Sequence, residues 1–259
     1  MAWKMFVSHH VAHLQPTVTT STSVTGYPAS NVRTTDPNTR WRTSPNVGVI
    51  VLDWDRGHTD GSAVGAALVL GSNAASDWEV RHGVSFPAGG SLGTNTDQVR
   101  NSYLELSSTS SLQHLRVLWD AAADPCEIGL VSIGVIYSVA DTGPQIRTQR
   151  GQAIPSTDTS PLHPFQGTQR VTRSFRKVTR ANADSILEAC SNYYIENTAG
   201  DEIDGFGGGG GQVPIALIDT GTSPATIYYG RSRVSVAPWA ANYSEVFVDM
   251  EQINIGGFF

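Results

Sequence analysis

Three aspartates close or follow a hydrophobic run near residue 50, and they are the first candidates for acid–base chemistry. Asp53 and Asp55 alternate at the end of the run, so on a strand they point to one face, and Asp60 follows. Retaining glycoside hydrolysis needs two carboxylates at a short, fixed separation. No other residue pattern supports catalysis, and strand ends are often acidic. We therefore expect structural carboxylates, no catalytic residue and no enzymatic activity.

His9, His10 and His13 are the candidates for metal ligation, since neutral imidazoles are common ligands. A site would need a fourth ligand, which the sequence does not supply, so we expect histidines at an interface and neither a metal nor another cofactor. The chain has no G-x-S-x-G, H-E-x-x-H, C-x-x-C or P-loop motif. The glycine run 207–211 has no following Lys-Ser/Thr and predicts a flexible loop.

Composition favours a β-rich protein and argues against nucleic acid as a partner. The 259 residues carry a net charge of −6, only 15% are charged, and Gly, Ser and Thr are abundant. No apolar run approaches the roughly 18 residues of a membrane-spanning helix. The first ten residues lack a signal-peptide pattern, so we expect synthesis in a cytoplasm. Cys126 and Cys190 are expected to be free, buried thiols.

Apolar and alternating runs predict the strands of a sandwich in the first half. Val47–Trp54 is apolar on both faces, as in a strand between two layers, whereas Trp78–His82 alternates between an inner and an outer face. Trp3, Phe6 and Val7 predict either a short strand or an arm packed on a neighbouring molecule. Other expected strands are Ala63–Leu70, Tyr103–Leu106, Leu115–Trp119 and Ile128–Val139.

The second half is expected to hold more strands and one helix. Thr179 is a plausible N-cap, and Ala183, Ile186, Leu187, Cys190 and Tyr194 recur at helical spacing. Strands are predicted at Arg170–Val178, Val213–Asp219, Thr226–Tyr229, Arg233–Val236 and Tyr243–Gln252. Alternation in the first of these places Arg173 and Lys177 on the face of Val171 and Phe175. We expect this basic run to make protein contacts rather than bind nucleic acid.

The stretch Tyr27–Thr43, YPASNVRTTDPNTRWRT, resembles the opening of discoidin-type (F5/8 type C, galactose-binding-like) β-sandwich domains in bacteriophage tail proteins. The later runs AALVLGSN, WEVRHG, HLRVLWD and DPCEIGLVSIGVIY follow the same order as in those domains, over about residues 27–140. The second half also resembles phage tail chains. The resemblance implies a mainly all-β chain, with a discoidin-like sandwich at 1–142 and a smaller β-rich domain at 143–259 carrying one short helix at about 180–195.

The resemblance further implies a non-enzymatic structural component of the tail tip or baseplate of a phage or phage-like particle. Its partners would be copies of itself, other tail proteins and host surface polysaccharide, and its location the virion tail after synthesis in the host cytoplasm. The alternatives are a free-standing carbohydrate-binding module and, from a third class, a glycan hydrolase. Oligomeric state distinguishes the tail component, which assembles with copies of itself or with tail proteins, from the free-standing module, which stays monomeric.

Loops at one end of discoidin-like domains often bind glycans, and aromatic faces beside polar groups suit sugar rings. The expected ligand-binding residues at that end are Trp41, Arg42, Trp54, Asp55 and His58. Trp41 and Trp54 can equally be core anchors. Three segments are expected to be ordered in the assembled particle, at least two of them against other chains: residues 1–16, residues 143–167 and the terminal Phe258-Phe259.

Overall fold

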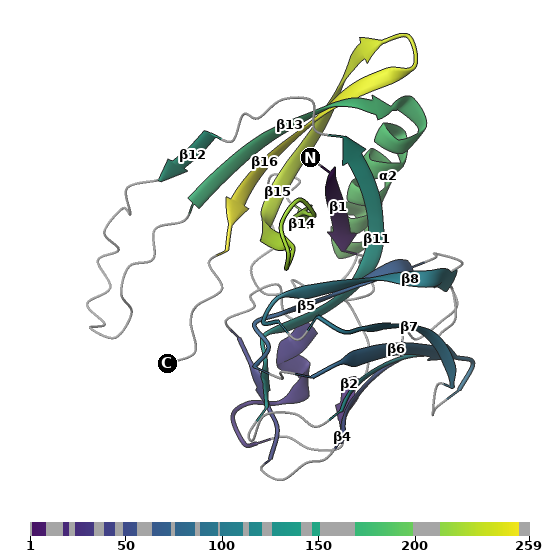
Figure 1. Ribbon diagram of the computed structural model, residues 1–259, viewed down its shortest axis with the longest axis vertical. Coiled ribbons are helices and arrows are strands. Elements are labelled where there is room, and N and C mark those ends of the chain that lie inside the picture. Colours follow the sequence, from purple (N-terminus) through teal and green to yellow (C-terminus); the bar gives the residue numbers. More distant parts are fainter. Residues whose placement is uncertain are drawn as a thin grey trace.

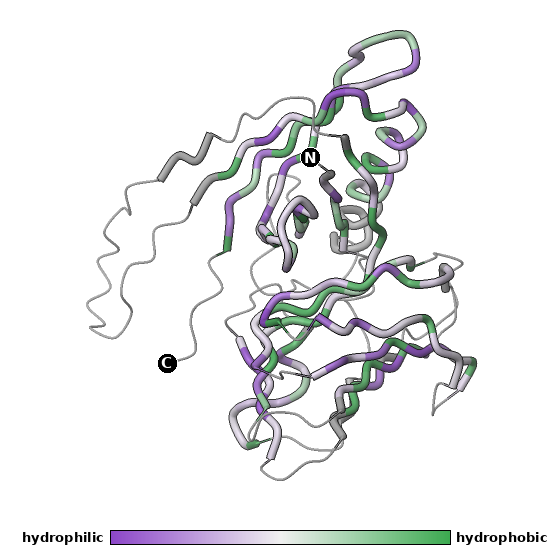
Figure 2. Tube along the Cα trace, viewed as in Figure 1, coloured by the Kyte–Doolittle hydropathy of each residue, from purple (hydrophilic) through white to green (hydrophobic). Residues whose placement is uncertain are grey.

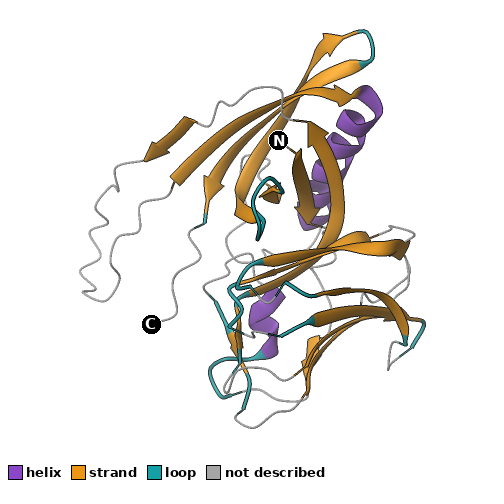
Figure 3. Cartoon of the chain, viewed as in Figure 1, coloured by secondary structure: helices purple, strands orange, loops and turns teal. Residues whose placement is uncertain are grey.

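The computed structural model describes residues 2–8, 18–20, 24–33, 39–44, 49–55, 64–73, 76–85, 89–97, 99–110, 114–120, 126–140, 147–150, 169–198 and 213–253. These residues form mostly antiparallel β-structure with one α-helix, which confirms the predicted fold class (Figure 3). Within this part of the chain, no helix is both long and apolar enough to cross a membrane.

The elements follow one another along the chain as β1 (Ala2–Ser8), β2 (Val18–Thr20), the 3-10 helix η1 (Ala29–Arg33), β3 (Trp41–Arg42), β4 (Val49–Asp55), β5 (Val64–Leu70), β6 (Trp78–Gly83), β7 (Gly90–Asn95), β8 (Ser102–Ser110), β9 (His114–Asp120), β10 (Glu127–Ile128), β11 (Leu130–Ala140), β12 (Arg147–Arg150), β13 (Gln169–Thr179), α2 (Arg180–Thr198), β14 (Val213–Asp219), β15 (Thr226–Ala240) and β16 (Tyr243–Gln252).

Two large sheets organise the molecule (Figure 1). The first has nine strands in the order β12-β13-β16-β15-β14-β1-β11-β5-β8, and the second has five in the order β2-β4-β9-β6-β7. A small ladder pairs β10 with β3. All strand pairs in the described residues are antiparallel.

The sandwich core lies between the five-stranded sheet and the β11-β5-β8 part of the larger one. Inward-facing residues such as Leu52, Val80 and Val117 meet Val69 and Ile133 from the opposite layer. The other face of β5 is buried too, because Leu68 belongs to a second cluster with residues of β14 and β15. Burial on both faces explains the unbroken apolar run of β5, and Figure 2 shows that β11 is likewise largely hydrophobic.

Strand β1 lies inside the nine-stranded sheet, between β11 and β14. Its side chains alternate between two cores: Trp3, Met5 and Val7 join the cluster beneath α2, whereas Phe6 joins the cluster shared by β5, β11, β14 and β15. Of the two predicted alternatives for this segment, the short strand is confirmed. The arm packed on a neighbouring molecule is wrong for residues 2–8, which pair with this chain's own strands. The predicted boundary at residue 142 falls between β11 and β12 and stays a prediction.

The predicted helix is confirmed as α2. Thr179 caps it as expected, because its Oγ1 accepts a hydrogen bond of 3.3 Å from the backbone N–H of Asn182. Ala183, Ile186 and Cys190 are buried at helical spacing against the strands of the same cluster. The helix therefore covers one face of the β13-β16-β15-β14-β1 part of the sheet.

Several local features differ from the sequence prediction. Residues 147–150 were expected in a structureless linker or loop, but they form β12, which pairs with β13. The two strands expected at Thr226–Tyr229 and Arg233–Val236 form one continuous strand, β15. Strand β7 was not predicted, because its Gly, Ser, Leu, Gly, Thr, Asn sequence has little hydrophobic alternation. In β13 a bulge follows Phe175, so Lys177 is exposed rather than on the buried face of Phe175.

Some of the predicted segments lie outside the described residues: 143–146, 151–167, 201–212, the three N-terminal histidines and Phe258-Phe259.

Candidate functional site

A tight turn and a short strand build one end of the sandwich. Gly26 takes a left-handed φ of 86°, which lets Val24 and Tyr27 form an isolated bridge. The turn is tied to β3 by two backbone hydrogen bonds, from Val24 N to Arg42 O (3.0 Å) and from Arg42 N to Tyr27 O (3.3 Å). The Asn31 side chain, on η1, donates to the carbonyl of Arg40 at 2.6 Å. The P-A-S-N and R-W-R parts of the motif are thus held side by side.

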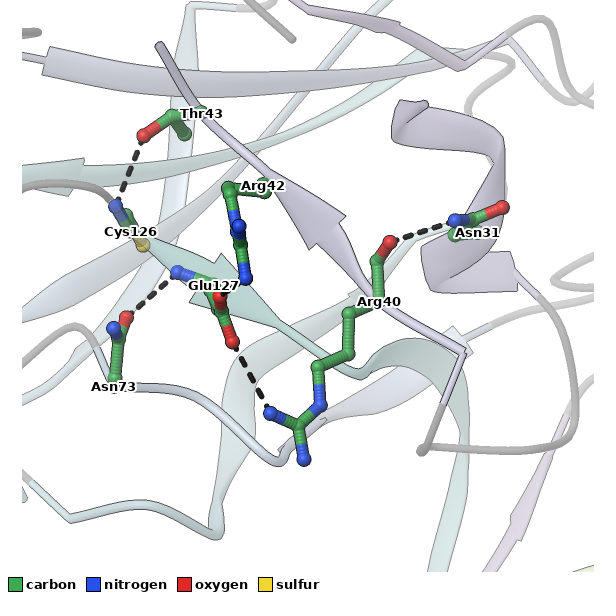
Figure 4. A network of polar contacts seen from close by, with 7 residues as sticks. All are labelled: Asn31, Arg40, Arg42, Thr43, Asn73, Cys126 and Glu127. Carbon is green, nitrogen blue, oxygen red and sulfur yellow. Dashed lines mark hydrogen bonds and ion pairs between the residues drawn. The ribbon is translucent and has the colours of Figure 1, made fainter. Parts of the chain in front are cut away.

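Glu127 is the centre of the polar network at this end (Figure 4). Its buried carboxylate forms ion pairs with Arg40, at 3.1 Å, and with Arg42. Its backbone N–H donates to the Asn73 side chain at 2.6 Å, and its carbonyl accepts from the Asn73 N–H at 3.0 Å. Beside it, the Cys126 N–H donates to Thr43 Oγ1 at 3.0 Å. These contacts fix β3, β10 and the segment after β5 to one another.

Guanidinium groups outnumber carboxylates in this network. Arg100 lies in the segment before β8, and its backbone carbonyl accepts a hydrogen bond from the N–H of Ser72 at 3.0 Å. Burial, and then the nearby charge of Arg40, lower the pKa of Arg100. Arg40 and Arg42 thus share the one Glu127 carboxylate, and the guanidinium group of Arg100 lies near that of Arg40.

Tyr27 provides an aromatic surface next to that charge. Its side chain is 38% exposed, and the guanidinium carbon of Arg42 lies 4.4 Å from its ring centroid. An exposed ring stacked on a fixed guanidinium offers a flat apolar face and hydrogen-bond donors within the same few ångströms. That combination suits a pyranose ring carrying a carboxylate or phosphate group. Tyr27 was not among the predicted site residues; its place in the motif, one residue before Pro28, was the available signal.

The predicted glycan-binding residues fall into different environments. Arg42 is at the site, half-buried and paired with Glu127. Trp41 is completely buried in the sandwich core, which matches the alternative interpretation as a core anchor. The side chains of Trp54 and Asp55 and the whole of His58 lie outside the described part of the structure.

Asp53, the first carboxylate considered for catalysis, forms a bidentate ion pair instead. Arg116, directly opposite on β9, donates to its two oxygens from Nε at 2.5 Å and from a terminal nitrogen at 2.7 Å. This cross-strand pair fits a structural role. Within the described ranges, no group of three His, Cys, Asp or Glu side chains is arranged to hold a metal ion.

An open pocket of about 320 Å³ lies elsewhere, where β8 meets the turn between β14 and β15. Tyr103 and Glu105 of β8 and Asp97 line one side, and residues of the turn line the other: Thr220, Thr222, Ser223, Pro224 and Ala225. Glu105 forms an ion pair with Lys4, whose ammonium lies 5.8 Å from the Tyr103 ring centroid. Burial raises the pKa of Tyr103, so this phenol stays protonated at neutral pH.

Comparison with known proteins finds no matching family model and no matching curated protein. Among solved structures, chitosan-binding module 1 of a chitosanase/glucanase from Paenibacillus sp. IK-5 is similar, with 18% identity, a TM-score of 0.40, and coverage of 48% of this chain and 98% of the module. CpGH89CBM32-5 from Clostridium perfringens, solved with GalNAc-β-1,3-galactose, has 10% identity and a TM-score of 0.42, over 49% of this chain and 99% of the module.

A Ruminococcus gnavus GH29 fucosidase, solved with fucose, is also similar, with 14% identity and a TM-score of 0.42, over 49% of this chain and 26% of the enzyme. All three matches cover about half of the present chain. At these sequence identities and TM-scores, the ligands and activities of the three proteins are not carried over to this chain.

Proposed function

We propose that the chain is a non-enzymatic structural component of a phage or phage-like tail tip, and that the Tyr27 end of its sandwich contacts surface glycans. The observation that carries the glycan contact is the exposed Tyr27 ring stacked on Arg42, which shares the Glu127 carboxylate with Arg40. The tail assignment rests on the sequence resemblance alone.

The charge of this end selects the class of glycan. Two guanidinium groups, of Arg40 and Arg42, share the one carboxylate of Glu127, so an incoming carboxylate or phosphate gains charge-assisted hydrogen bonds where a neutral sugar gains weaker ones. Acidic surface polysaccharides are therefore the favoured ligands. Because these interactions are partly exposed, binding should weaken as salt is added.

A glycan array carrying matched neutral and acidic bacterial surface glycans tests the proposal. We expect the acidic members to bind, and Tyr27→Ala to lower binding at least fivefold. Val84→Ala is the control, because Val84 is 78% exposed, directly follows β6, and belongs neither to the Tyr27 site nor to the β15–β16 hairpin. Equal binding by both variants, or no bound glycan, would remove the glycan part of the proposal.

The tail assignment has a separate test. Gold-labelled antibody against this chain should decorate the tail tip of native particles in electron micrographs. Label on the capsid, or on no particle, would contradict it and favour the free-standing carbohydrate-binding module. Turnover of envelope polysaccharide that is lost in Asp53→Asn would favour the hydrolase instead.

A further inference from the structure

The β15–β16 hairpin carries a patch of exposed aromatic side chains and one cation, hereafter the hairpin patch: Lys177, Trp239, Tyr243 and Phe247. Trp239 and Tyr243 flank the hairpin turn and are 42% and 41% exposed, with their rings 6.4 Å apart in an edge-on arrangement. Phe247, on the same strand as Tyr243, is 36% exposed. Trp and Tyr exposed together are typical of contact surfaces rather than of free strands.

Lys177 is held at this patch by an unusual backbone. It lies in the bulge between Phe175 and Val178 and has a φ of 59°, a left-handed conformation that a lysine rarely adopts. The bulge turns its ammonium over the Trp239 ring, at 5.9 Å from the centroid. Bulges that re-aim a side chain are common at functional surfaces. The hairpin patch is therefore an aromatic projection with a fixed positive charge.

The pocket between β8 and the β14–β15 turn has the opposite character. Asp97 gives it a negative charge, the second carboxylate, of Glu105, is paired with Lys4, and Tyr103 adds an aromatic wall. It already accommodates an ammonium group, since Lys4 pairs with Glu105 beside the Tyr103 ring. Its volume of about 320 Å³ is at the small end of the roughly 300–1,000 Å³ typical of ligand pockets, which suits one or two protein side chains.

The hairpin patch and the pocket lie at opposite ends of one strand and cannot meet within one molecule. Strand β15 begins at Thr226, directly after the pocket-lining Ala225, and runs to Ala240, directly after Trp239. At about 3.3 Å per residue the strand separates them by roughly 40 Å. Figure 1 shows the hairpin projecting away from the rest of the molecule at the far end of β15.

We propose that the hairpin patch of one copy docks into the acidic pocket of the next, so that copies of this chain associate head to tail. Lys177 faces Asp97 across the contact, since Glu105 is already paired with Lys4, and Trp239 packs against Tyr103. Different surfaces meet in such a contact, so it repeats and closes into a ring or continues as a filament. This inference deepens the assembly role proposed above and rests on it, but it is independent of glycan binding.

Two variants of the full chain test the contact by sedimentation velocity over a range of concentrations. The patch variant combines Lys177→Glu with Trp239→Ser, and the pocket variant is Asp97→Lys; all three side chains are exposed. We expect each variant to self-associate at least tenfold more weakly than the parent. An equimolar mixture should form a one-to-one complex that grows no further, since each variant keeps the surface that the other lacks.

Glu188→Lys, which changes an exposed carboxylate of α2 outside both surfaces, is the charge-matched control and should associate like the parent. A mixture that associates no better than its components would overturn the proposal, as would a monomeric parent. Association of the parent that neither variant weakens would overturn this contact, place the interface on another face and leave the assembly role standing. Thermal melts of each variant confirm that the fold is retained.

Discussion

The guanidinium carbon of Arg173 lies 3.5 Å from the centroid of the Trp3 ring. Arg173 is on β13 and Trp3 is on β1, so the contact joins two strands separated by three others in the nine-stranded sheet. Both side chains are buried beside α2, and Trp3 also meets Phe175 and Tyr228 at centroid distances of 6.3 and 6.0 Å. A charged group buried on an aromatic face gains more from that contact than an exposed one.

Trp3→Ala is expected to lower the free energy of unfolding by about 3–5 kcal/mol, because it leaves a large cavity and removes the ring beneath Arg173. Urea denaturation measures the change. Trp239→Ala, which truncates a tryptophan that is 42% exposed, is the control and should cost much less. Similar costs for both would mean that β1 is not seated in the core.

Gly134→Ala should be more destabilising than its single methyl group indicates. A Cβ at Gly134 would lie 2.1 Å from the carbonyl oxygen of Val7, so β1 and β11 would have to move apart. Overpacking of this kind costs about 1–3 kcal/mol or more. At Gly89 an added Cβ meets nothing within 4 Å, so Gly89→Ala should leave the melting temperature nearly unchanged. Equal melting temperatures for the two variants would argue against the β1–β11 pairing.

Glu127→Gln should destabilise the chain by about 3–5 kcal/mol, the cost of removing one partner from a buried ion pair. Arg40 and Arg42 would keep their charges without the carboxylate that compensates them. Chemical denaturation of Glu79→Gln provides the comparison, because the ion pair of Glu79 with Arg81 is more exposed and should cost about 1 kcal/mol or less. A small effect at Glu127 would show that the network is freely solvated.

The two cysteines predict a loss of stability at alkaline pH. Burial raises the pKa of both Cys126 and Cys190 to about 12, with Glu127 adding to the effect at Cys126. The unfolded chain loses these protons at about pH 8.5. The stabilisation that the protonated thiols provide is therefore complete below the pKa of the unfolded chain. It falls as the pH rises from that value towards the folded-state pKa of about 12. Unfolding measured at pH 7 and pH 10 should show a drop that is smaller in a Cys126→Ala, Cys190→Ala double variant.

Local patterns in the sequence were enough to predict many elements. The apolar run of β5 and the alternation of β6 show in which direction each strand buries its side chains. The capping threonine and the spacing of buried residues placed the start of α2 correctly. These signals depend only on residues close together in the chain, which is why they can be seen without a structure.

Features that depend on distant residues were not predictable. Nothing within residues 2–8 indicates pairing with both β11 and β14, because the matching information lies far along the chain. Gly230 and Pro238 interrupt the β15 pattern, and only the pairing with β16 shows that the strand continues. At the candidate site, the motif located Arg42, but only the packed core shows that Trp41 points inward and that Tyr27 provides the exposed ring.

The central position of β1 has a consequence for biosynthesis. A ribosome releases residues 2–8 long before the residues of β14, so one edge of β1 has no partner until most of the chain has been translated. During that interval the strand exposes backbone groups and the apolar side chains of Trp3, Met5 and Phe6, a combination that invites wrong pairing. Such non-local closure is slow, so the yield of native protein is expected to depend on chaperones and on temperature during expression.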